Sequence, residues 1–220
     1  SWSDVMPDPT YLTHINYAFG HVNDSFDGVR IDNEARLQSI IALKKKHPHL
    51  KVLLSIGGWG SGRFSEMAAD VVNRGKFAQD CERVVKDFKL DGIDIDWEYP
   101  TNSSAGISAA ESDTENFTLL MRDIRKAIGK KKLLTLASVS SGQYIAFDQI
   151  KNDVDFVNIM TYDSGNPPYH HASLYRSPLS GRTTCAEAVK AHIAAGMPAE
   201  KLVLGIPFYG RGNKTDIKGF

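Results

Sequence analysis

The sequence has no excess of charge of either sign, since 26 lysine and arginine residues balance 26 aspartate and glutamate residues. A balanced chain lacks the basic field that attracts nucleic acid or an anionic membrane, so we expect neither as a partner. The chain also lacks an apolar run near the roughly 20 residues that a membrane-spanning helix needs. No signal peptide is visible. We therefore expect a partner that is small or uncharged.

Cysteine is scarce too. The two cysteines, Cys81 and Cys185, fall in segments with helical periodicity and lack the CxxC spacing of a zinc site. For each we expect a buried thiol in a helix and no disulfide framework. The spacing of the histidines supports no metal site either. We accordingly expect no metal and no cofactor.

Apolar residues are plentiful enough to build a core. They make up 42% of the 220 residues, and no low-complexity stretch divides the chain. A chain of this length and composition is typical of a globular protein with one sizeable core. We expect residues 1–220 to form one domain, with no second domain.

One acidic stretch stands out. Asp94, Asp96 and Glu98 alternate with the large apolar residues Ile95 and Trp97. A period of two predicts a strand whose acids share one face. Three neighbouring carboxylates repel one another and resist burial, so stability alone would not place them there. The apolar opposite face is typical of a central strand, so we interpret the acids as a functional cluster and not as a solvated edge.

Further strands and helices alternate along the chain. Apolar strand-like runs occupy residues 13–20, 51–58, 133–139, 156–162 and 202–209. Helical patterns occupy residues 33–47, 73–88, 112–128 and 183–195, with a short helical turn near Phe147. No two consecutive strands lie close enough for a tight hairpin, which favours an α/β fold with parallel strands and right-handed crossovers.

Two α/β architectures compete. A doubly wound sheet usually has a glycine-rich phosphate loop after its first strand, and residues 19–23 have none. A (β/α)8 TIM barrel instead gathers polar and aromatic side chains at the C-terminal ends of its strands. Such residues end five of the expected strands here: Tyr17 and Phe19; Gly58 and Trp59; Asp96 and Glu98; Met160, Tyr162 and Asp163; Tyr209 and Arg211.

Six strands cannot close an eight-stranded barrel. We expect strands 2 to 7 of the barrel to be present and strands 1 and 8 to be lacking. Residues 1–3 read as a loop that has just left a strand, and residues 218–220 end without a helix after the last strand. We therefore interpret the chain as part of a longer catalytic domain, which alone would expose two unpaired sheet edges and fold poorly.

The spacing of the acids limits their chemistry. On a strand with a rise of about 3.3 Å per residue, Asp96 and Glu98 point the same way. They cannot flank a scissile bond on opposite faces, as the acid and the carboxylate nucleophile do in ordinary retaining glycosidases. The nucleophile must come from elsewhere. The inner carboxylates should raise the pKa of Glu98, which suits a general acid.

These motifs resemble those of a known family. The segment from Asp91 to Glu98 (DGIDIDWE) resembles the DxxDxDxE signature of the family 18 glycoside hydrolases, the chitinase family. Residues 16–19, 55–59, 160–163 and 209–211 resemble four further family motifs, in family order. The resemblance implies a TIM-barrel glycoside hydrolase that cleaves β-1,4-linked N-acetylglucosamine in chitin or chitooligosaccharides. It also implies retention, with the C2 acetamido group of the substrate as the nucleophile.

The resemblance implies a role for each motif residue. Glu98 would protonate the glycosidic oxygen, Asp96 would bind the acetamido nitrogen, Asp94 would support Asp96, and Tyr162 would bind the acetamido oxygen. The remaining residues would bind the sugar rings or shape the pocket: Tyr17, Phe19, Gly58, Trp59, Met160, Asp163, Tyr209 and Arg211.

Three alternatives stay open at this stage. One is an endo-β-N-acetylglucosaminidase that acts on N-glycans. Another is a non-catalytic chitin-binding lectin, although such relatives usually lack the acid found here as Glu98. The third is a divalent metal site on Asp94, Asp96 and Glu98, which we do not expect. The resemblance further implies a secreted, extracellular monomer.

Overall fold

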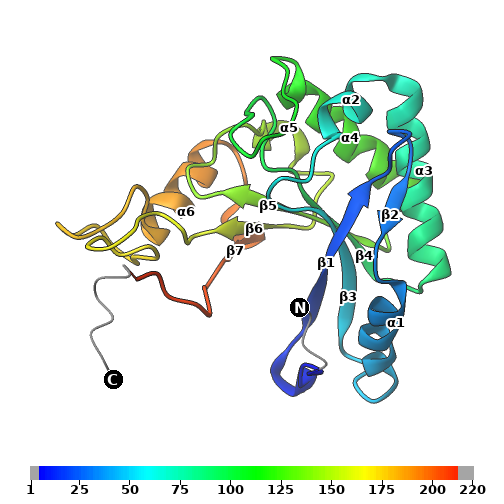
Figure 1. Cartoon of the computed structure of the whole chain (residues 1–220), viewed down its shortest axis with the longest axis horizontal. Coiled ribbons are helices and arrows are strands. Elements are labelled where there is room, and N and C mark those ends of the chain that lie inside the picture. The colour runs from blue at the N-terminus through cyan, green and yellow to red at the C-terminus, as the bar shows by residue number, and fades with distance from the viewer. Residues whose placement is uncertain (1–4, 213–220) are drawn as a thin grey trace. The chain divides into compact units, whose positions relative to one another are not determined.

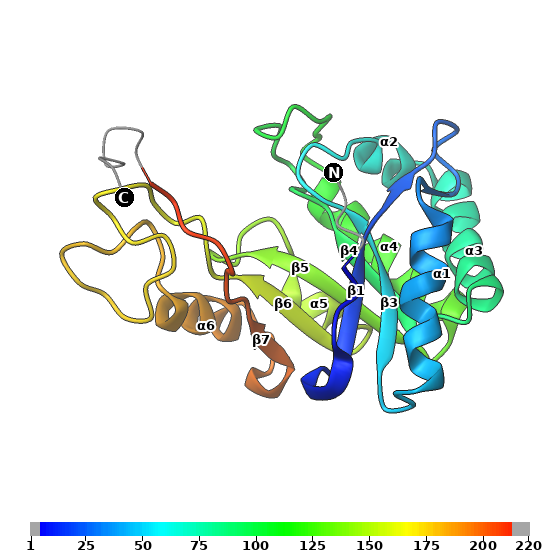
Figure 2. The same cartoon turned by 60° about the horizontal axis from the view of Figure 1, so that its bottom comes forward.

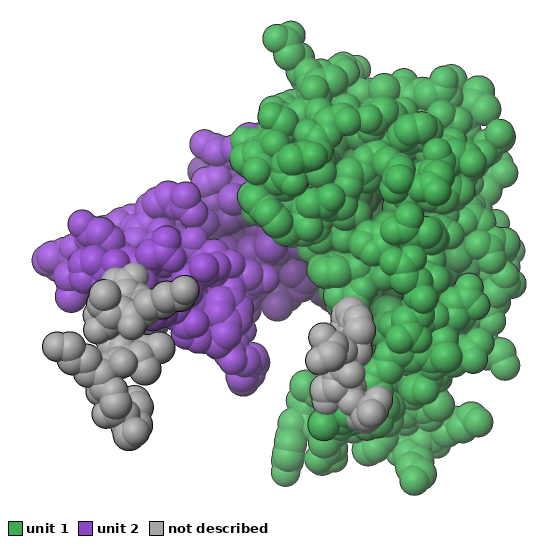
Figure 3. Space-filling model, in the orientation of Figure 1, with its two compact units in different colours: residues 1–135 green, residues 136–220 purple. Residues whose placement is uncertain are grey.

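The computed structural model describes residues 5–212 of the chain. The chain divides into two compact units, residues 1–135 and 136–220 (Figure 3). The boundary falls inside β5 (Leu133–Val139). The strand order of the sheet is β2-β1-β3-β4-β5-β6-β7. Residues 1–3 and 218–220, from which we inferred the missing barrel strands, lie outside the described residues.

The first unit contains four whole strands: β1 (His14–Val22), β2 (Val29–Ile31), β3 (Lys51–Gly57) and β4 (Gly92–Asp96). Strand β3 is parallel to both β1 and β4. All residues of β3 after the first are buried, as expected for a central strand. The parallel arrangement of these three strands confirms the prediction.

Strand β2 corrects the prediction that no consecutive strands form a hairpin. It runs antiparallel to β1, with Arg30 opposite His21. The connection closes where the amide of Asn23 donates to the carbonyl oxygen of Gly28 at 2.8 Å. Sequence periodicity misses β2 because three residues are too few to establish an alternating pattern.

The helices of the first unit are η1 (Pro9–Tyr11), α1 (Glu34–Ala42) with its continuation η2 (Leu43–Lys45), α2 (Phe64–Ala69), α3 (Val71–Asp87) and α4 (Asp113–Ile128). Helices α1, α3 and α4 lie on one side of β1, β3 and β4 (Figures 1 and 2). Helix α3 packs against α4, and α2 contacts both. Helix α2 was not predicted, since six residues hold less than two turns of helical pattern.

The second unit contains β6 (Phe156–Met160), β7 (Leu202–Leu204), α5 (Phe147–Ile150), α6 (Cys185–Ala194) and η3 (Ala199–Lys201). Strands β6 and β7 are parallel. Helix α6 begins with a capping box, in which the Thr184 side chain and Glu187 satisfy each other's backbone amides.

Both strands of the second unit end earlier than predicted. Strand β6 stops at Met160, where the amide of Thr161 donates to the carbonyl oxygen of Ile159 at 2.9 Å and forms a tight turn in place of a ladder hydrogen bond. Strand β7 stops at Leu204, before Gly205 and Pro207, and proline cannot donate to a ladder. Tyr162, Tyr209 and Arg211 therefore lie in the segments after the strands.

The two cysteines are free thiols. Cys81 is fully buried in α3, where burial raises the pKa of its thiol, as expected of a structural cysteine. Cys185 is the first residue of α6 and is only partly buried, so the expectation of a buried thiol is confirmed for Cys81 alone. Among residues 5–212, no helix combines the length and the apolar character needed to cross a membrane.

Candidate functional site

The residues that the sequence singled out fall in both units. The first unit holds Tyr17, Phe19, Gly58, Trp59 and the acid cluster, which we define as Asp94, Asp96 and Glu98. The second unit holds Met160 and Tyr162 together with the Asp163 cluster, which we define as Asp163, His171, Tyr209 and Arg211.

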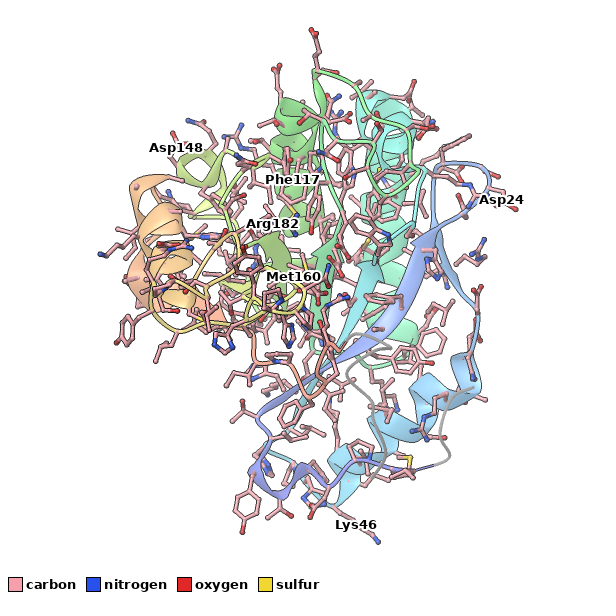
Figure 4. All side chains as sticks on the ribbon, turned by 60° about the vertical axis from the view of Figure 1, so that its left-hand side comes forward. Asp24, Lys46, Phe117, Asp148, Met160 and Arg182 are labelled. Atoms are coloured by element: carbon pink, nitrogen blue, oxygen red, sulfur yellow. The ribbon has the colours of Figure 1, made fainter. Side chains whose placement is uncertain are left out.

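The packing of Trp97 shows which way the side chains of Asp94 and Asp96 point. Its ring stacks on Phe64 of α2, with centroids 5.3 Å apart and planes 13° apart, and lies 6.1 Å from Phe117 of α4. Figure 4 labels Phe117 on α4. Because side chains alternate along a strand, the face of β4 that carries Asp94 and Asp96 points away from the helices. The strand itself ends at Asp96, so Glu98 lies in the turn that follows it.

Asp94 is held by two hydroxyl groups. It is 2% exposed, and its carboxylate accepts a hydrogen bond from Ser55 at 2.7 Å and another from Thr135 at 2.5 Å. Ser55 lies opposite Asp94 in the β3–β4 register, and Thr135 lies on β5. Neither of these two supporting residues was assigned from the sequence. The sequence signal that could have identified them is a hydroxyl side chain within an otherwise apolar strand.

Asp96 lies in a strongly perturbing environment. It is 7% exposed, and burial, followed by the charges of Glu98 and Asp94, raises the pKa of its carboxyl to about 8. Within the described part of the chain, its Oδ1 is buried and has no hydrogen-bond partner. Buried polar atoms are nearly always paired, so an unpaired carboxyl oxygen indicates a functional position.

Glu98 is also largely buried, with 9% of its surface exposed. Its charge contributes to the raised pKa of Asp96, which places the two carboxyl groups in one electrostatic environment. The raised pKa that we predicted for Glu98 itself stays a prediction.

Two glycines bring the end of β3 against the end of β4. The amide of Gly58 donates to the carbonyl oxygen of Asp96 at 2.8 Å. Gly57 has a φ of 128°, and a Cβ at this position would lie 1.9 Å from the same carbonyl oxygen. A Cβ on Gly58 would lie 2.8 Å from the ring of Phe19. Only glycine permits this close approach of backbone and ring.

Aromatic side chains lie beside the end of β3. Phe19 is 36% exposed and Trp59 is 63% exposed. The Trp59 ring meets Tyr99 edge-on, with centroids 6.3 Å apart. Phe19 and Trp59 line a hollow of about 280 Å³ together with His21. Apolar rings exposed in a hollow are suited to the flat faces of sugar rings.

Tyr17 does not line the hollow that Phe19 and Trp59 share. It is 7% exposed, and its hydroxyl donates to the carbonyl oxygen of Asn33, the N-cap of α1, at 3.1 Å. Its side chain is therefore directed towards the helix layer. The prediction of Tyr17 as a sugar platform is wrong. The register of β1 shifts between Ala18 and Gly20, so Tyr17 and Phe19 do not share a face as regular alternation would require.

The Asp163 cluster is organised by hydrogen bonds. Oδ1 of Asp163 accepts from the Tyr209 hydroxyl at 2.9 Å and from Nε of Arg211 at 2.7 Å. Burial raises the pKa of Asp163, but the hydrogen bonds from Arg211 and Tyr209 outweigh it and hold the pKa below its usual value. His171 lies 3.7 Å from the same oxygen and was not assigned from the sequence, since nothing in its loop distinguishes it from a surface histidine.

Tyr162 and Met160 lie next to this cluster along the chain. The rings of Tyr162 and Tyr209 meet edge-on at 6.4 Å. Met160, labelled in Figure 4, is the last residue of β6 and is partly buried. Arg182, also labelled there, donates to the carbonyl oxygen of Asp163 at 3.1 Å. The loop after β6 is thus folded back on Asp163 by side chains of the second unit.

No group of three or more His, Cys, Asp or Glu side chains in residues 5–212 is arranged to hold a metal ion. The carboxylates of the acid cluster are among the side chains that this finding covers.

Comparison with known proteins identifies relatives across the chain. The family model for glycosyl hydrolases family 18 matches residues 1–219. Chitinase A1 of Niallia circulans is 32% identical over 93% of this chain and 40% of its own length. Chitotriosidase-1 of Mus musculus is 34% identical over 93% of this chain and 48% of its own length. The chain thus spans about half the length of these curated relatives.

The solved structures agree. The chitinase domain of the spore coat protein CotE from Clostridium difficile superposes with a TM-score of 0.87 and 38% identity, over 94% of this chain and 64% of that one. Together with the mostly parallel, seven-stranded sheet, this similarity confirms the predicted fold class, an α/β fold of the (β/α)8 barrel type of which this chain carries part.

Proposed function

Because the chain belongs to family 18 of the glycosyl hydrolases, we propose that it hydrolyses β-1,4-linked N-acetylglucosamine in chitin or chitooligosaccharides. The names of the relatives, which include chitinases and a chitotriosidase, support this substrate class. We further propose that the reaction retains the anomeric configuration and uses the substrate's own acetamido group as the nucleophile.

The observation that carries the proposal is the unpaired Oδ1 of Asp96. This oxygen is buried, lies in the same environment as Glu98 and accepts no hydrogen bond from the described residues. The acetamido N–H of N-acetylglucosamine is a donor that would satisfy it. A bond to that N–H would hold the acetamido oxygen against the anomeric carbon, and an oriented intramolecular nucleophile accelerates attack strongly.

Glu98 is the proposed proton donor. It gives its proton to the glycosidic oxygen as the acetamido oxygen attacks the anomeric carbon, which yields an oxazolinium intermediate and releases the leaving sugar. Glu98 then takes a proton from water, which opens the oxazolinium ring with overall retention. The direction of Asp94 and Asp96 supports this scheme, because carboxylates on one strand approach a substrate from one side.

Asp94 is proposed to support Asp96. The hydroxyls of Ser55 and Thr135 fix its carboxylate, so a proton shared between Asp94 and Asp96 has a defined position. The raised pKa of Asp96, about 8, supports a carboxyl that keeps its proton near neutral pH until substrate arrives.

The remaining residues are proposed to bind sugar. Phe19 and Trp59 offer exposed rings beside the acid cluster. Gly58 has no Cβ, which leaves room for the ring of Phe19. For Tyr162, as the partner of the acetamido oxygen, and for the pocket residues Met160, Asp163, Tyr209 and Arg211, the assignment rests on the family motifs.

The decisive experiment is the conversion Glu98→Gln in the full chain. Turnover of an N-acetylglucosamine hexamer should fall by several orders of magnitude, while calorimetry should still detect hexamer binding. Retained turnover would refute the assignment of Glu98. Wild-type protein that binds the hexamer without cleaving it would indicate a lectin, and cleavage of N-glycans in preference to the hexamer would indicate an endo-β-N-acetylglucosaminidase.

We also propose that the protein acts outside the cell as a monomer, which rests on the family resemblance. Fractionation of the native host, with size-exclusion chromatography of the secreted fraction, would test both statements.

A further inference from the structure

The segment that carries Trp59 has little restraint of its own. Glycine occupies four of the six positions from Gly57 to Gly62. Glycine has more conformational freedom to lose than any other residue. Trp59 is 63% exposed, so packing covers only a minor part of its ring. We call residues 58–63 the Trp59 loop. Something outside the loop must fix it if the ring is to meet a ligand in one pose.

The β1–β2 hairpin supplies two contacts to this loop. Nδ1 of His21 and the hydroxyl of Ser61 are 2.9 Å apart and form a hydrogen bond. The carboxylate of Asp24 pairs with the guanidinium of Arg63 at 2.7 Å. Asp24 lies in the turn between β1 and β2, at the tip of the hairpin (Figure 4). The two contacts hold the second half of the Trp59 loop, at Ser61 and Arg63.

The hairpin is itself fixed to α3. The amide of Val29 donates to the carboxylate of Asp80 at 2.7 Å. Lys76, also on α3, lies 3.5 Å from Asp27. Gly28 permits this approach, since a Cβ there would lie 3.0 Å from Asp80. A hairpin anchored to the longest helix of the unit is a firm support for a glycine-rich loop.

We propose that the β1–β2 hairpin positions the Trp59 loop for the binding of long N-acetylglucosamine chains, with His21 and Asp24 as positioning residues. The inference rests on the proposed function, because it takes Trp59 to be a platform for sugar. The side chain of Asp24 is 78% exposed and that of Arg63 40% exposed. An exposed pair of this kind changes an equilibrium by about fivefold at most, so its loss should leave the fold intact.

The test compares two tether variants with a matched control in the full chain. Asp24→Ala removes the ion pair with Arg63 and the longer one with Arg30, and Ser61→Ala removes the hydrogen-bond partner of His21. Glu82→Ala is the matched control, because it removes an acid whose ion pair is with Lys86 on α3 and with neither the hairpin nor the Trp59 loop. The readouts are kcat and KM for an N-acetylglucosamine hexamer and for a short chromogenic dimer.

Each tether variant should raise KM for the hexamer by about threefold, within the range for exposed pairs, with kcat and the dimer KM unchanged. Glu82→Ala should match the wild type. The variant Asp24→Glu keeps the carboxylate and should retain most of the wild-type KM for the hexamer, which a defect caused by any substitution at this position would not do.

The variant Trp59→Ala distinguishes a failure of the positioning inference from a failure of the proposed sugar-binding role of Trp59. If it raises the hexamer KM while Asp24→Ala and Ser61→Ala behave as wild type, the positioning inference is overturned. If Trp59→Ala itself has no effect, the inference falls with the role of Trp59, although hydrolysis stands. If the wild type cleaves neither substrate, the proposed function fails.

Discussion

Gly57 lies so close to Asp96 that a Cβ on the glycine would come within 1.9 Å of the carbonyl oxygen of Asp96. The next residue, Gly58, donates its amide to that oxygen at 2.8 Å. The loop that carries Trp59 and the strand that carries the acids are therefore joined at one backbone oxygen, and the position of Asp96 depends on a residue without a side chain.

Substitution Gly57→Ala should be strongly destabilising. The new methyl group meets backbone that cannot move aside cheaply, and the φ of 128° is itself unfavourable for alanine. We expect a loss of about 3 kcal/mol or more in the free energy of unfolding, measured by urea denaturation. Gly106→Ala is the matched control, since Gly106 also has a positive φ but no heavy atom within 4 Å of an added Cβ. Equal losses for both variants would contradict the steric argument.

Substitution Asp96→Asn should change the pH dependence of stability. The folded pKa of Asp96, about 8, lies above the unfolded value of about 4, so the folded state holds a proton that the unfolded state releases in this interval. Its contribution to stability is complete below about pH 4 and is lost as the pH rises towards 8. Relative to Asp96→Asn, the wild type should become less stable from pH 4 to pH 8 in chemical denaturation. An unchanged difference between the two proteins over that range would contradict the raised pKa.

Substitution Thr135→Val should weaken the support of Asp94. Valine keeps the shape of threonine but removes the hydroxyl that donates to the buried carboxylate. We expect a loss of about 1 to 3 kcal/mol in unfolding free energy. If Asp94 supports Asp96 as proposed, kcat should fall as well, with KM changed little. Thr135→Ser keeps the donor and should retain most of the activity, and equal kcat values for the two variants would argue against a role for this hydrogen bond.

Substitution Tyr17→Phe should affect stability and leave substrate binding unchanged. The Tyr17 hydroxyl donates to Asn33 in the helix layer and does not line the hollow beside Trp59. We expect a loss of about 1 kcal/mol in thermal or chemical unfolding. The KM for the N-acetylglucosamine hexamer should equal that of the wild type. A raised KM would restore Tyr17 to the list of sugar-binding residues.

Substitution His192→Gln should reduce the acid sensitivity of the second unit. His192 is fully buried, with Nε2 at 2.9 Å from the Ser138 hydroxyl and Nδ1 at 2.8 Å from the carbonyl oxygen of Ala188. Burial lowers the pKa of its ring, so its contribution to stability is present above the unfolded pKa of about 6.5 and is lost as the pH falls below it. The variant should lose less stability than the wild type between pH 7 and pH 5. Parallel curves would contradict this role.

Some features of the acid stretch follow from its sequence pattern, and others do not. Alternation along residues 92–98 predicted the strand, its apolar face and its acids, and Trp97 packed between Phe64 and Phe117 confirms the direction of that face. The alternation did not show that β4 ends at Asp96, nor that Ser55 and Thr135 reach Asp94. Those contacts join residues about 40 positions apart, and a pattern within one segment has no access to them.

The distinction between local patterns and contacts of distant segments holds for the other features of the chain as well. The sequence by itself determined the α/β class, the parallel central strands and the alternation of acidic and apolar residues along the acid stretch, because local periodicity and ordered motifs encode these features. The tertiary structure alone decided that Tyr17 faces the helix layer and that a hairpin follows β1. It also decided that the pKa of Asp96 is raised and that its buried Oδ1 has no hydrogen-bond partner among the described residues. Burial, hydrogen-bond partners and pKa values depend on which distant segments meet, and they are set only once the chain has folded.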